Sequence, residues 1–203
     1  MTQSRNESPG NQHVVILGGG FAGATLAAKL ERRLPAAWEI YLLSEDNYLT
    51  YKPLLPEVVG ATILPGSVVA PLRLLTRRTR VRMVSVTGVD LEQKQVLYRG
   101  RTEGTLRYDH LVFACGQRPR GDLIDGMDRY GYPLASIGDA LRLRNRIVAR
   151  LEQATIEPDP DIRRWLLRFL VIGGGFSGVE VAGALQDLLC ASVRYYKNVT
   201  EDD

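Results

Sequence analysis

Glycine recurs at two places where the chain could bind a phosphate. Residues 18–23 read G-G-G-F-A-G, and residues 173–178 read G-G-G-F-S-G. In such a loop the first glycine allows a tight turn, the second lets the backbone approach a pyrophosphate, and the third lets helix and strand pack closely. The following helix directs its free N–H groups toward the phosphates. We therefore predict two dinucleotide sites, with these residues: Gly18, Gly20, Phe21, Ala22 and Gly23 in the first loop and Gly173, Gly175 and Gly178 in the second.

An acidic residue about 20 positions after the glycines usually holds a ribose hydroxyl in such sites. Glu45 lies 22 residues after Gly23 and is the candidate, with Ser44 directly before it. A surface glutamate in a loop is the alternative explanation for Glu45. The second loop lacks such a partner, because Thr200 stands 22 residues after Gly178.

Each loop needs a strand before it and a helix after it. The first has the apolar run Val14–Leu17, typical of a buried parallel strand, and a helical stretch over 24–34. The second has Phe169–Ile172 and a helical stretch over 178–196. One glycine match would be weak, and a simple glycine-rich turn is its alternative. Two matches in the same strand–loop–helix context favour nucleotide binding.

The remaining elements are predicted from apolar periodicity. Ser136–Ala154 has apolar residues on one helical face, and Val68–Arg78 is also predicted to be helical. Lys52–Pro56 is expected to be extended, and 157–161 to be a connector. The expected strands are Glu39–Leu43, Val81–Val86, Val89–Tyr98, Thr105–Tyr108 and Leu111–Ala114, the third and fourth in a small antiparallel meander.

These elements predict an α/β protein with two Rossmann-like dinucleotide-binding folds and a small antiparallel meander. The two hexads begin 155 residues apart, about the length of one domain. The expected domains are 1–117 for the first fold, 118–165 for a connector with a helix, and 166–203 for the start of the second fold. The second fold is expected to be truncated, since its next strand would begin near Asp203.

Composition excludes several classes of protein. The net charge of +3 is too small to indicate a nucleic-acid partner, and the two cysteines, Cys115 and Cys190, form no CxxC pair or metal set. No apolar run is expected to reach the roughly 18 residues that span a bilayer. The polar start, 1–13, predicts no secretion signal and therefore a cytoplasmic protein. Arginines cluster in 73–82 and 142–150, which indicates solvated faces, with contact to a membrane surface or a partner as the alternative.

The chain resembles the pyridine nucleotide–disulfide oxidoreductase superfamily, and within it the N-terminal portion of type II NADH dehydrogenases, the single-subunit NADH:quinone oxidoreductases. The resemblance runs from Val14 to about Lys197. Its matching stretches are V-V-I-L-G-G-G-F-A-G, D-N-Y-L-T-Y-K-P-L-L-P-E-V, Y-D-H-L-V-F-A-C-G, D-A-L-R-L-R-N-R-I and V-I-G-G-G-F-S-G-V-E-V-A-G. Disulfide reductases of the superfamily carry paired cysteines after the second strand, where residues 47–56 have none. Thiol chemistry is therefore disfavoured.

The resemblance implies cofactors, a partner and residue roles. FAD would occupy the first fold and NADH the second, with hydride passing to the flavin and electrons onward to a quinone. The glycines of the two loops would face the two pyrophosphates, and Glu45 would hold the FAD ribose, unless Ser44 occupies that position. Lys52, Pro53 and Leu54 would lie near the isoalloxazine ring, and Val86 would meet the adenine through its backbone. Glu180 would be the catalytic acid near the flavin and the nicotinamide, in a proton relay to the quinone. The alternative explanation for Glu180 is an acid in the first turn of a helix that complements the helix dipole.

The sequence departs from the family in two ways. The last FAD strand ends in Ala114–Cys115–Gly116, where the family has A-T-G, so we expect Cys115 to be a small buried substitute for threonine in the FAD site. The later parts of the family's chain are missing, including the C-terminal segment expected to attach it peripherally to the inner face of the membrane. The alternative function is therefore an inactive fragment that at most binds a dinucleotide and is poorly soluble.

Overall fold

The structure is a computed structural model and describes residues 11–117, 120–121 and 124–200. The chain divides into two compact units. One comprises Met1–Leu49 and Ala70–Gln117, and the other Thr50–Val69 and Arg118–Asp203. The expectations for the polar start, 1–10, and for the acidic end, 201–203, lie outside the described residues. Residues 50–69, expected within the first domain, group with the second unit.

The first unit is built on a parallel sheet. Its strands are β1 (His13–Leu17), β2 (Glu39–Ser44), β5 (Arg80–Met83) and β9 (His110–Phe113), in the spatial order β5-β2-β1-β9. Val14 pairs with Ile40 on one side of β1 and with His110 on the other. The predicted strands around the first glycine loop are therefore present in the expected parallel arrangement.

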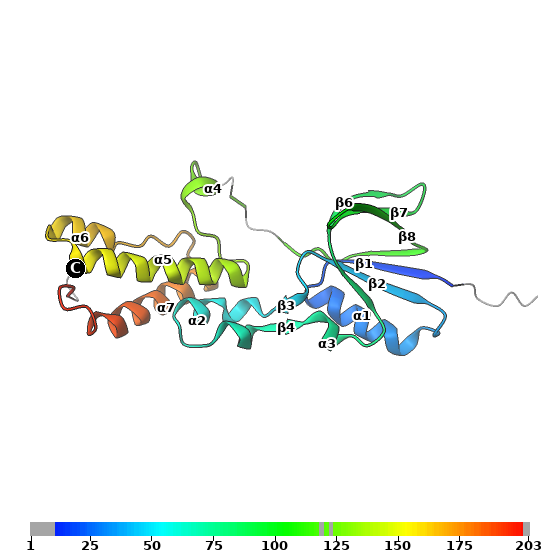
Figure 1. The fold of residues 1–203 in the computed structure, drawn as a ribbon, viewed down its shortest axis with the longest axis horizontal. Helices are drawn as coiled ribbons and strands as arrows, with labels where there is room; N and C mark the ends of the chain where they lie inside the picture. Colours follow the sequence, from blue (N-terminus) through cyan, green and yellow to red (C-terminus); the bar gives the residue numbers. More distant parts are fainter. Residues whose placement is uncertain (1–10, 118–119, 122–123, 201–203) are drawn as a thin grey trace, which may run out of the picture. The chain divides into compact units, whose positions relative to one another are not determined.

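Both faces of this sheet are covered, which explains why its central strands are continuously apolar. Helix α1 (Phe21–Arg33) packs on the face that contains Val14 and Ile16. The opposite face, with Val15 and Leu17, packs against a meander. The meander is formed by β6 (Ser85–Asp90), β7 (Gln95–Arg99) and β8 (Glu103–Arg107), all antiparallel (Figure 1).

The strand order reverses at β1, which makes this edge of the sheet a topological switch point. From β1 the chain first moves to β2 on one side and later returns to β9 on the other side. Ligands of open α/β sheets bind outside the carboxyl ends of the strands at such a reversal. The first glycine loop leaves β1 at this point, so the topology positions it for ligand binding.

The predicted helix over 68–78 was wrong for most of its length. Val69–Pro71 forms strand β4, which pairs with β3 (Tyr48–Thr50), and only Leu72–Leu75 is helical, as α3. Pro71 is the residue before the helix and lacks an N–H, so the helix cannot extend backward through it without losing a hydrogen bond.

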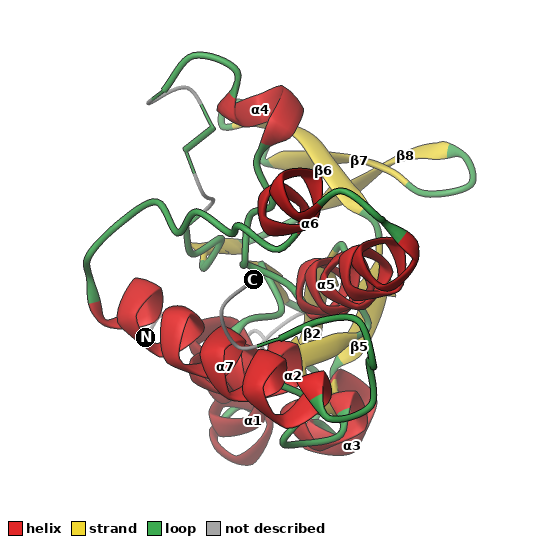
Figure 2. Cartoon of the chain, turned by 90° about the vertical axis from the view of Figure 1, so that its left-hand side faces the viewer, coloured by secondary structure: helices red, strands yellow, loops and turns green. Residues whose placement is uncertain are grey.

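The second unit is helical in its described residues. Helix α2 (Leu55–Val59) packs against α5 (Ile137–Ile156) and α7 (Phe176–Val193), as Figure 2 shows. Val58 and Ile147 are fully buried among these helices. The shorter elements are η1 (Lys52–Leu54), η2 (Pro65–Val68), α4 (Met127–Tyr130) and α6 (Pro160–Leu166). The predicted helix over 136–154 is confirmed as α5, which begins with a capping box between Ser136 and Asp139.

Proline marks two elements that the sequence reasoning missed. Residues 52–56, expected to be extended, form η1 and the start of α2, with Pro53 and Pro56 in their first turns. Pro160 begins α6 inside the expected connector, and Asp159 caps it. Proline suits the first turn of a helix because its missing N–H has no partner there in any case.

The predicted strand Phe169–Ile172 does not form. Phe169 and Val171 pack on the helical core, whereas Leu170 and Ile172 are 85% and 51% exposed. The alternation is that of a strand, but no described strand lies beside this segment to pair with its backbone. Residues 169–172 are therefore an extended segment without the backbone pairing that defines a β-strand.

Among the described residues, one helix, α7, is long and apolar enough to cross a membrane when judged by length and composition alone. Its mean hydropathy is 1.2, and 6% of it is buried. Helices of soluble proteins also meet this criterion, so it is weak evidence for a span. The expectation that no stretch reaches this length was nevertheless wrong for α7, whose many Ala, Val and Leu residues outweigh Glu180 and Asp187.

Candidate functional site

The first glycine loop has the geometry that its pattern predicts. Gly18 has φ +106°, a conformation that side chains rarely adopt, and a Cβ on it would lie 2.3 Å from the Ala114 carbonyl oxygen. A Cβ on Gly23 would lie 1.9 Å from the Gly18 carbonyl oxygen. The loop is held to the sheet because the Gly18 N–H donates to the Leu43 carbonyl at 2.8 Å. The first and third glycines are therefore required by close backbone packing.

The second glycine of the loop faces open space. A Cβ on Gly20 would meet no atom within 4 Å. Gly20 also precedes α1, whose first turn has no acidic residue and no side-chain cap. No side chain caps the start of this 13-residue helix, and an uncapped helix start is typical of an anion site. The chemistry and shape of this loop fit a pyrophosphate.

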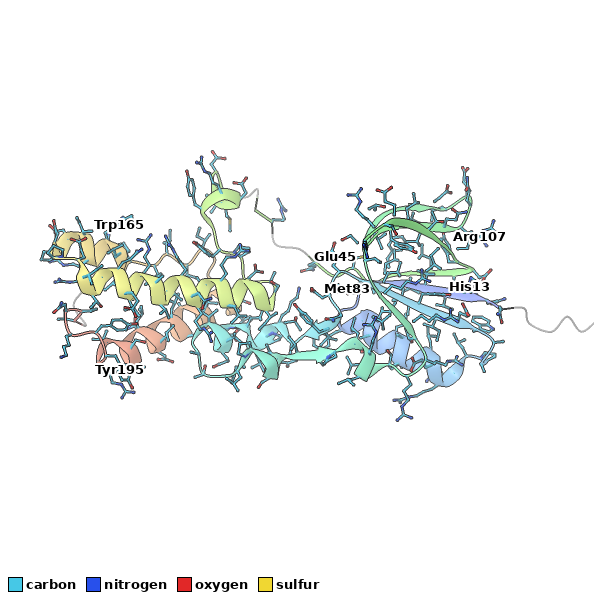
Figure 3. The ribbon with its side chains drawn as sticks, in the orientation of Figure 1. His13, Glu45, Met83, Arg107, Trp165 and Tyr195 are labelled. Carbon is cyan, nitrogen blue, oxygen red and sulfur yellow. The ribbon has the colours of Figure 1, made fainter. Side chains whose placement is uncertain are left out.

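Ser44 and Glu45 lie at the carboxyl edge of the sheet in different surroundings. A Cβ on Gly19 would come within 2.5 Å of the Ser44 hydroxyl oxygen, so Ser44 lies against the glycine loop. The Glu45 carboxylate is exposed and accepts a hydrogen bond from the Ser85 hydroxyl at 3.1 Å. Figure 3 shows Glu45 and Met83 at this edge. Of the two ribose candidates, Ser44 therefore lies against the loop, whereas Glu45 is bonded to Ser85. Val86, the residue after Ser85, is exposed.

Cys115 is not the buried residue that the sequence predicts. It is exposed, with its Sγ atom 3.7 Å from the Leu17 carbonyl oxygen. The reason is its place in the chain: Ala114, Cys115 and Gly116 follow the end of β9 at the same carboxyl edge, beyond the packed part of the sheet. Cys190 is also exposed, on α7, and both thiols are free.

The second glycine loop repeats the geometry of the first. Gly173 has φ +111°, and a Cβ on Gly178 would lie 1.9 Å from the Gly173 carbonyl oxygen. Nothing lies within 4 Å of a Cβ on Gly175, which precedes α7 without a side-chain cap. The two hexads thus share a backbone conformation as well as a sequence, although only the first follows a strand that is paired in a sheet.

A cleft in the second unit brings three predicted site residues together. Lys52 and Pro53 come from η1 and Glu180 from α7, and the cleft has a volume of about 390 Å³. Its other lining residues are Pro56, Leu134, Phe176 and Ser177. Small-molecule sites typically have volumes of roughly 300–1,000 Å³ and an apolar lining with a few polar groups. One ammonium group and one carboxylate in such a lining suit a ligand with a polar ring.

The structure changes the alternative explanation for Glu180. It is the fifth residue of α7, and the first turn of that helix contains no acid. The explanation as a first-turn acid that complements the helix dipole was therefore wrong, because the dipole effect is confined to the terminal turn. Its position in the cleft remains the feature that marks this residue.

Sequence reasoning did not single out four residues of the cleft. Phe176 and Ser177 stand between the second and third glycines of the second hexad, so the pattern contained a signal for them. Pro56 and Leu134 gave no such signal, because only the packing of α2 and of the segment before α5 brings them to the cleft. No group of metal-ligating side chains occurs in the part of the chain that the structure describes.

The parallel sheet, its strand order and the glycine loop define an α/β protein with a glycine loop at the topological switch point. Residues 12–200 match the family model for pyridine nucleotide-disulphide oxidoreductases, and the chain belongs to that family. It is 36% identical over 187 residues to the type II NADH:quinone oxidoreductase Ndh of Mycobacterium tuberculosis, covering 90% of this chain and 40% of Ndh. It is 32% identical over 194 residues to external NADH-ubiquinone oxidoreductase 2 of Saccharomyces cerevisiae, a mitochondrial protein, covering 90% of this chain and 35% of that one.

The fold is also similar to that of a solved relative. NDH2 from Plasmodium falciparum, in a structure in complex with NADH, matches with a TM-score of 0.85 and 26% identity. The match covers 93% of this chain and 39% of that one. This chain therefore spans about two fifths or less of the length of each of these three relatives.

Proposed function

We propose that this chain is part of an FAD-dependent oxidoreductase that takes hydride from NADH and passes electrons to a quinone. The observation that carries the proposal is the repetition of one glycine-loop geometry in a chain whose relatives are NADH:quinone oxidoreductases. Two such loops suit two dinucleotides, one the electron donor and one the resident cofactor. The proposal includes two Rossmann-like folds, the second incomplete within these residues, and the domain limits predicted above.

The residues of the first unit fit FAD. Gly18, Gly20 and Gly23, with Phe21 and Ala22 between them, would hold its pyrophosphate at the start of α1. Ser44 or Glu45 would bind the ribose, and the Val86 backbone would meet the adenine. Ala114, Cys115 and Gly116 would border the same site. The open space at Gly20 and the absence of a side-chain cap on α1 support this assignment.

The residues of the second unit fit NADH and the reacting ends of both cofactors. Gly173, Gly175 and Gly178 would face the NADH pyrophosphate, and Lys52, Pro53 and Leu54 would lie near the isoalloxazine ring. A bound flavin supplies acceptance of hydride and transfer of electrons. Glu180 would hold or release a proton at its carboxyl oxygen, and the apolar side chains around it would exclude water. We place the protein in the cytoplasm, peripheral on the inner face of the membrane, where a quinone is accessible.

A second candidate function is dinucleotide binding without turnover. The observation that favours it is that the chain spans 40% or less of its relatives. Catalytic groups of those proteins can lie in the part that these residues do not match. In this case the chain would bind a dinucleotide through its first unit alone.

The visible absorbance spectrum of the purified chain tests the proposal, with released flavin identified by chromatography. We expect bound FAD that NADH bleaches. Gly20→Val should remove the flavin and Gly175→Val should remove the bleaching alone, because each side chain would enter a phosphate position. The matched control is Gly66→Val, another glycine with no atom within 4 Å of its Cβ position. A colourless protein would refute the FAD assignment for this chain.

Glu180→Gln tests the proton role separately. We expect unchanged flavin content and bleaching, and quinone-dependent NADH oxidation lower by about 100-fold, a typical contribution of an acid–base group. Ser177→Ala, at the same cleft, is the matched control. Bound flavin that NADH does not bleach would favour the second candidate, and an active Glu180→Gln variant would refute the proton role.

A further inference from the structure

Three arginines lie along one flank of α5 in the second unit. Arg142, Arg146 and Arg150 follow one another at intervals of four residues, so their side chains lie on the same side of the helix over about 12 Å of its length. Arg142 and Arg146 are exposed. Neither forms a hydrogen bond or ion pair with another residue of the described part of the chain. Their charges are therefore directed to solvent or to a partner.

Helix α6 adds an exposed indole to this flank. The Arg150 guanidinium lies over the Trp165 ring, 5.0 Å from its centroid, and Trp165 is 60% exposed. Figure 3 labels Trp165 beside α6. Ile162, three residues earlier on α6 and hence on the same side of it, is also exposed. We call Arg142, Arg146, Arg150, Ile162 and Trp165 the arginine–indole face.

The nearby acids do not neutralise this face. Asp139 accepts hydrogen bonds from the Ala135 and Ser136 backbone and from the Ser136 hydroxyl in the capping box. Asp161 pairs with Arg164 at 3.0 Å. The Glu157 carboxylate accepts the Asp159 N–H. These three carboxylates hydrogen-bond to other groups and not to the arginines, so the arginines form a positive strip along α5.

From this combination we infer that the arginine–indole face docks on an anionic lipid surface. Arginine attracts anionic headgroups, and an indole beside an aliphatic side chain is suited to the boundary between headgroups and acyl chains. A nucleic acid would be attracted by the same charges, but the small net charge of the chain and the single indole favour a membrane. The inference rests on the peripheral location in the proposed function and adds a contact surface in this chain to the C-terminal attachment that the resemblance implies.

Sedimentation with vesicles tests this inference. The full chain should bind vesicles of phosphatidylcholine mixed with phosphatidylglycerol, and should bind phosphatidylcholine alone much more weakly. The double variant Arg142→Gln/Arg146→Gln should lose affinity for the anionic vesicles by about 25-fold, since each arginine near such a surface contributes about fivefold. Added salt should weaken binding of the parent chain.

The matched control removes the same charge elsewhere. Arg101→Gln/Arg107→Gln changes two exposed arginines of the meander and should leave vesicle binding nearly unchanged. An equal loss in both double variants would overturn the inference, because binding would then depend on net charge alone. Binding to single-stranded RNA without binding to anionic vesicles would also overturn it. Circular dichroism checks that each variant is folded.

Tryptophan fluorescence gives a second measurement that does not depend on affinity. The chain has two tryptophans, so Trp38→Phe leaves Trp165 as the sole reporter. Anionic vesicles should shift its emission to the blue, and brominated acyl chains should quench it. Absence of both effects while the protein is bound would place Trp165 away from the lipid and overturn the inference. Neither measurement depends on electron transfer, so its failure would leave the oxidoreductase proposal standing.

Discussion

At the scale of the residue, three glycines of one short loop have separable roles. Gly18 is needed for its backbone conformation and Gly23 for close packing, whereas the Cβ position of Gly20 faces open space. The same distinction recurs at Gly173, Gly178 and Gly175. A stability measurement can therefore separate the glycines that the loop needs for its backbone from the glycine that faces open space.

Gly23→Ala is expected to destabilise the chain by about 3 kcal/mol, the upper range for overpacking, because its new methyl group would overlap the Gly18 carbonyl oxygen. Gly20→Ala is the matched control within the same loop and should change the free energy of unfolding by less than about 0.5 kcal/mol. Urea denaturation followed by circular dichroism measures both. Equal destabilisation by the two substitutions would contradict the close approach of Gly23 to the Gly18 carbonyl oxygen.

At the scale of the element, one carboxylate ties α1 to the segment that leads into β5. The Glu31 carboxylate accepts hydrogen bonds from the backbone N–H groups of Arg77, Arg78 and Thr79, at 2.6 to 3.0 Å. Burial of this carboxyl group acts to raise its pKa, but the hydrogen bonds outweigh that effect and lower the pKa overall. The chain therefore folds most favourably around the ionised form.

Glu31→Gln is expected to cost about 1–2 kcal/mol of stability at neutral pH, because hydrogen bonds to a charged acceptor become neutral ones. Since the pKa is lower in the folded state, the stabilisation is fully present above the ordinary glutamate pKa. It is lost as the pH falls through the lowered value. The difference in unfolding free energy between parent and variant should thus shrink in acid.

Thermal or urea unfolding across this acidic range measures the difference, with Glu92→Gln in an exposed turn as the control. A difference that does not depend on pH would contradict the role of the Glu31 charge.

The start of α5 is a second test at this scale. Ser136→Ala removes the side chain that accepts the Asp139 N–H at 3.1 Å, and should cost about 1 kcal/mol, a typical value for an N-cap. Ser192→Ala, near the end of α7, lacks a capping bond and should cost much less. Denaturation midpoints compare the two, and an equal effect would argue against the capping box as a stabilising contact.

At the scale of the whole molecule, the chain exposes an apolar segment that has the alternation of a strand. Leu170 and Ile172 point to solvent beside the exposed Phe176, and the backbone between them is unpaired by any described strand. Exposed, unpaired segments of this type promote association with other chains. The expected poor solubility of the isolated chain remains a prediction, and this segment is its structural basis.

Leu170→Lys/Ile172→Thr should therefore raise the soluble fraction and lower light scattering on standing. The matched control, Leu74→Lys/Leu91→Thr, changes two other exposed apolar residues and should have a smaller effect. Light scattering at increasing protein concentration provides the comparison. If both double variants improve solubility equally, hydrophobicity in general, and not this segment, drives association.

The features that the sequence alone determined are those that depend on local geometry. The glycines predicted both loops because backbone conformation and close packing at those positions allow little else. Apolar runs predicted β1, β2 and β9, and the periodic helix α5 followed from its apolar face. These patterns act over a few residues, so they can be recognised without knowledge of the rest of the fold.

Only the tertiary structure decided features that depend on distant neighbours. Phe169–Ile172 has the sequence of a strand but no described partner, because pairing is a property of two segments. Cys115 is exposed because of its place beyond the end of β9, and the packing of α2 on α7 brings Lys52 into one cleft with Glu180. Contacts between residues more than a hundred positions apart leave no local pattern in the sequence, so the cleft could be located only after the helices were packed.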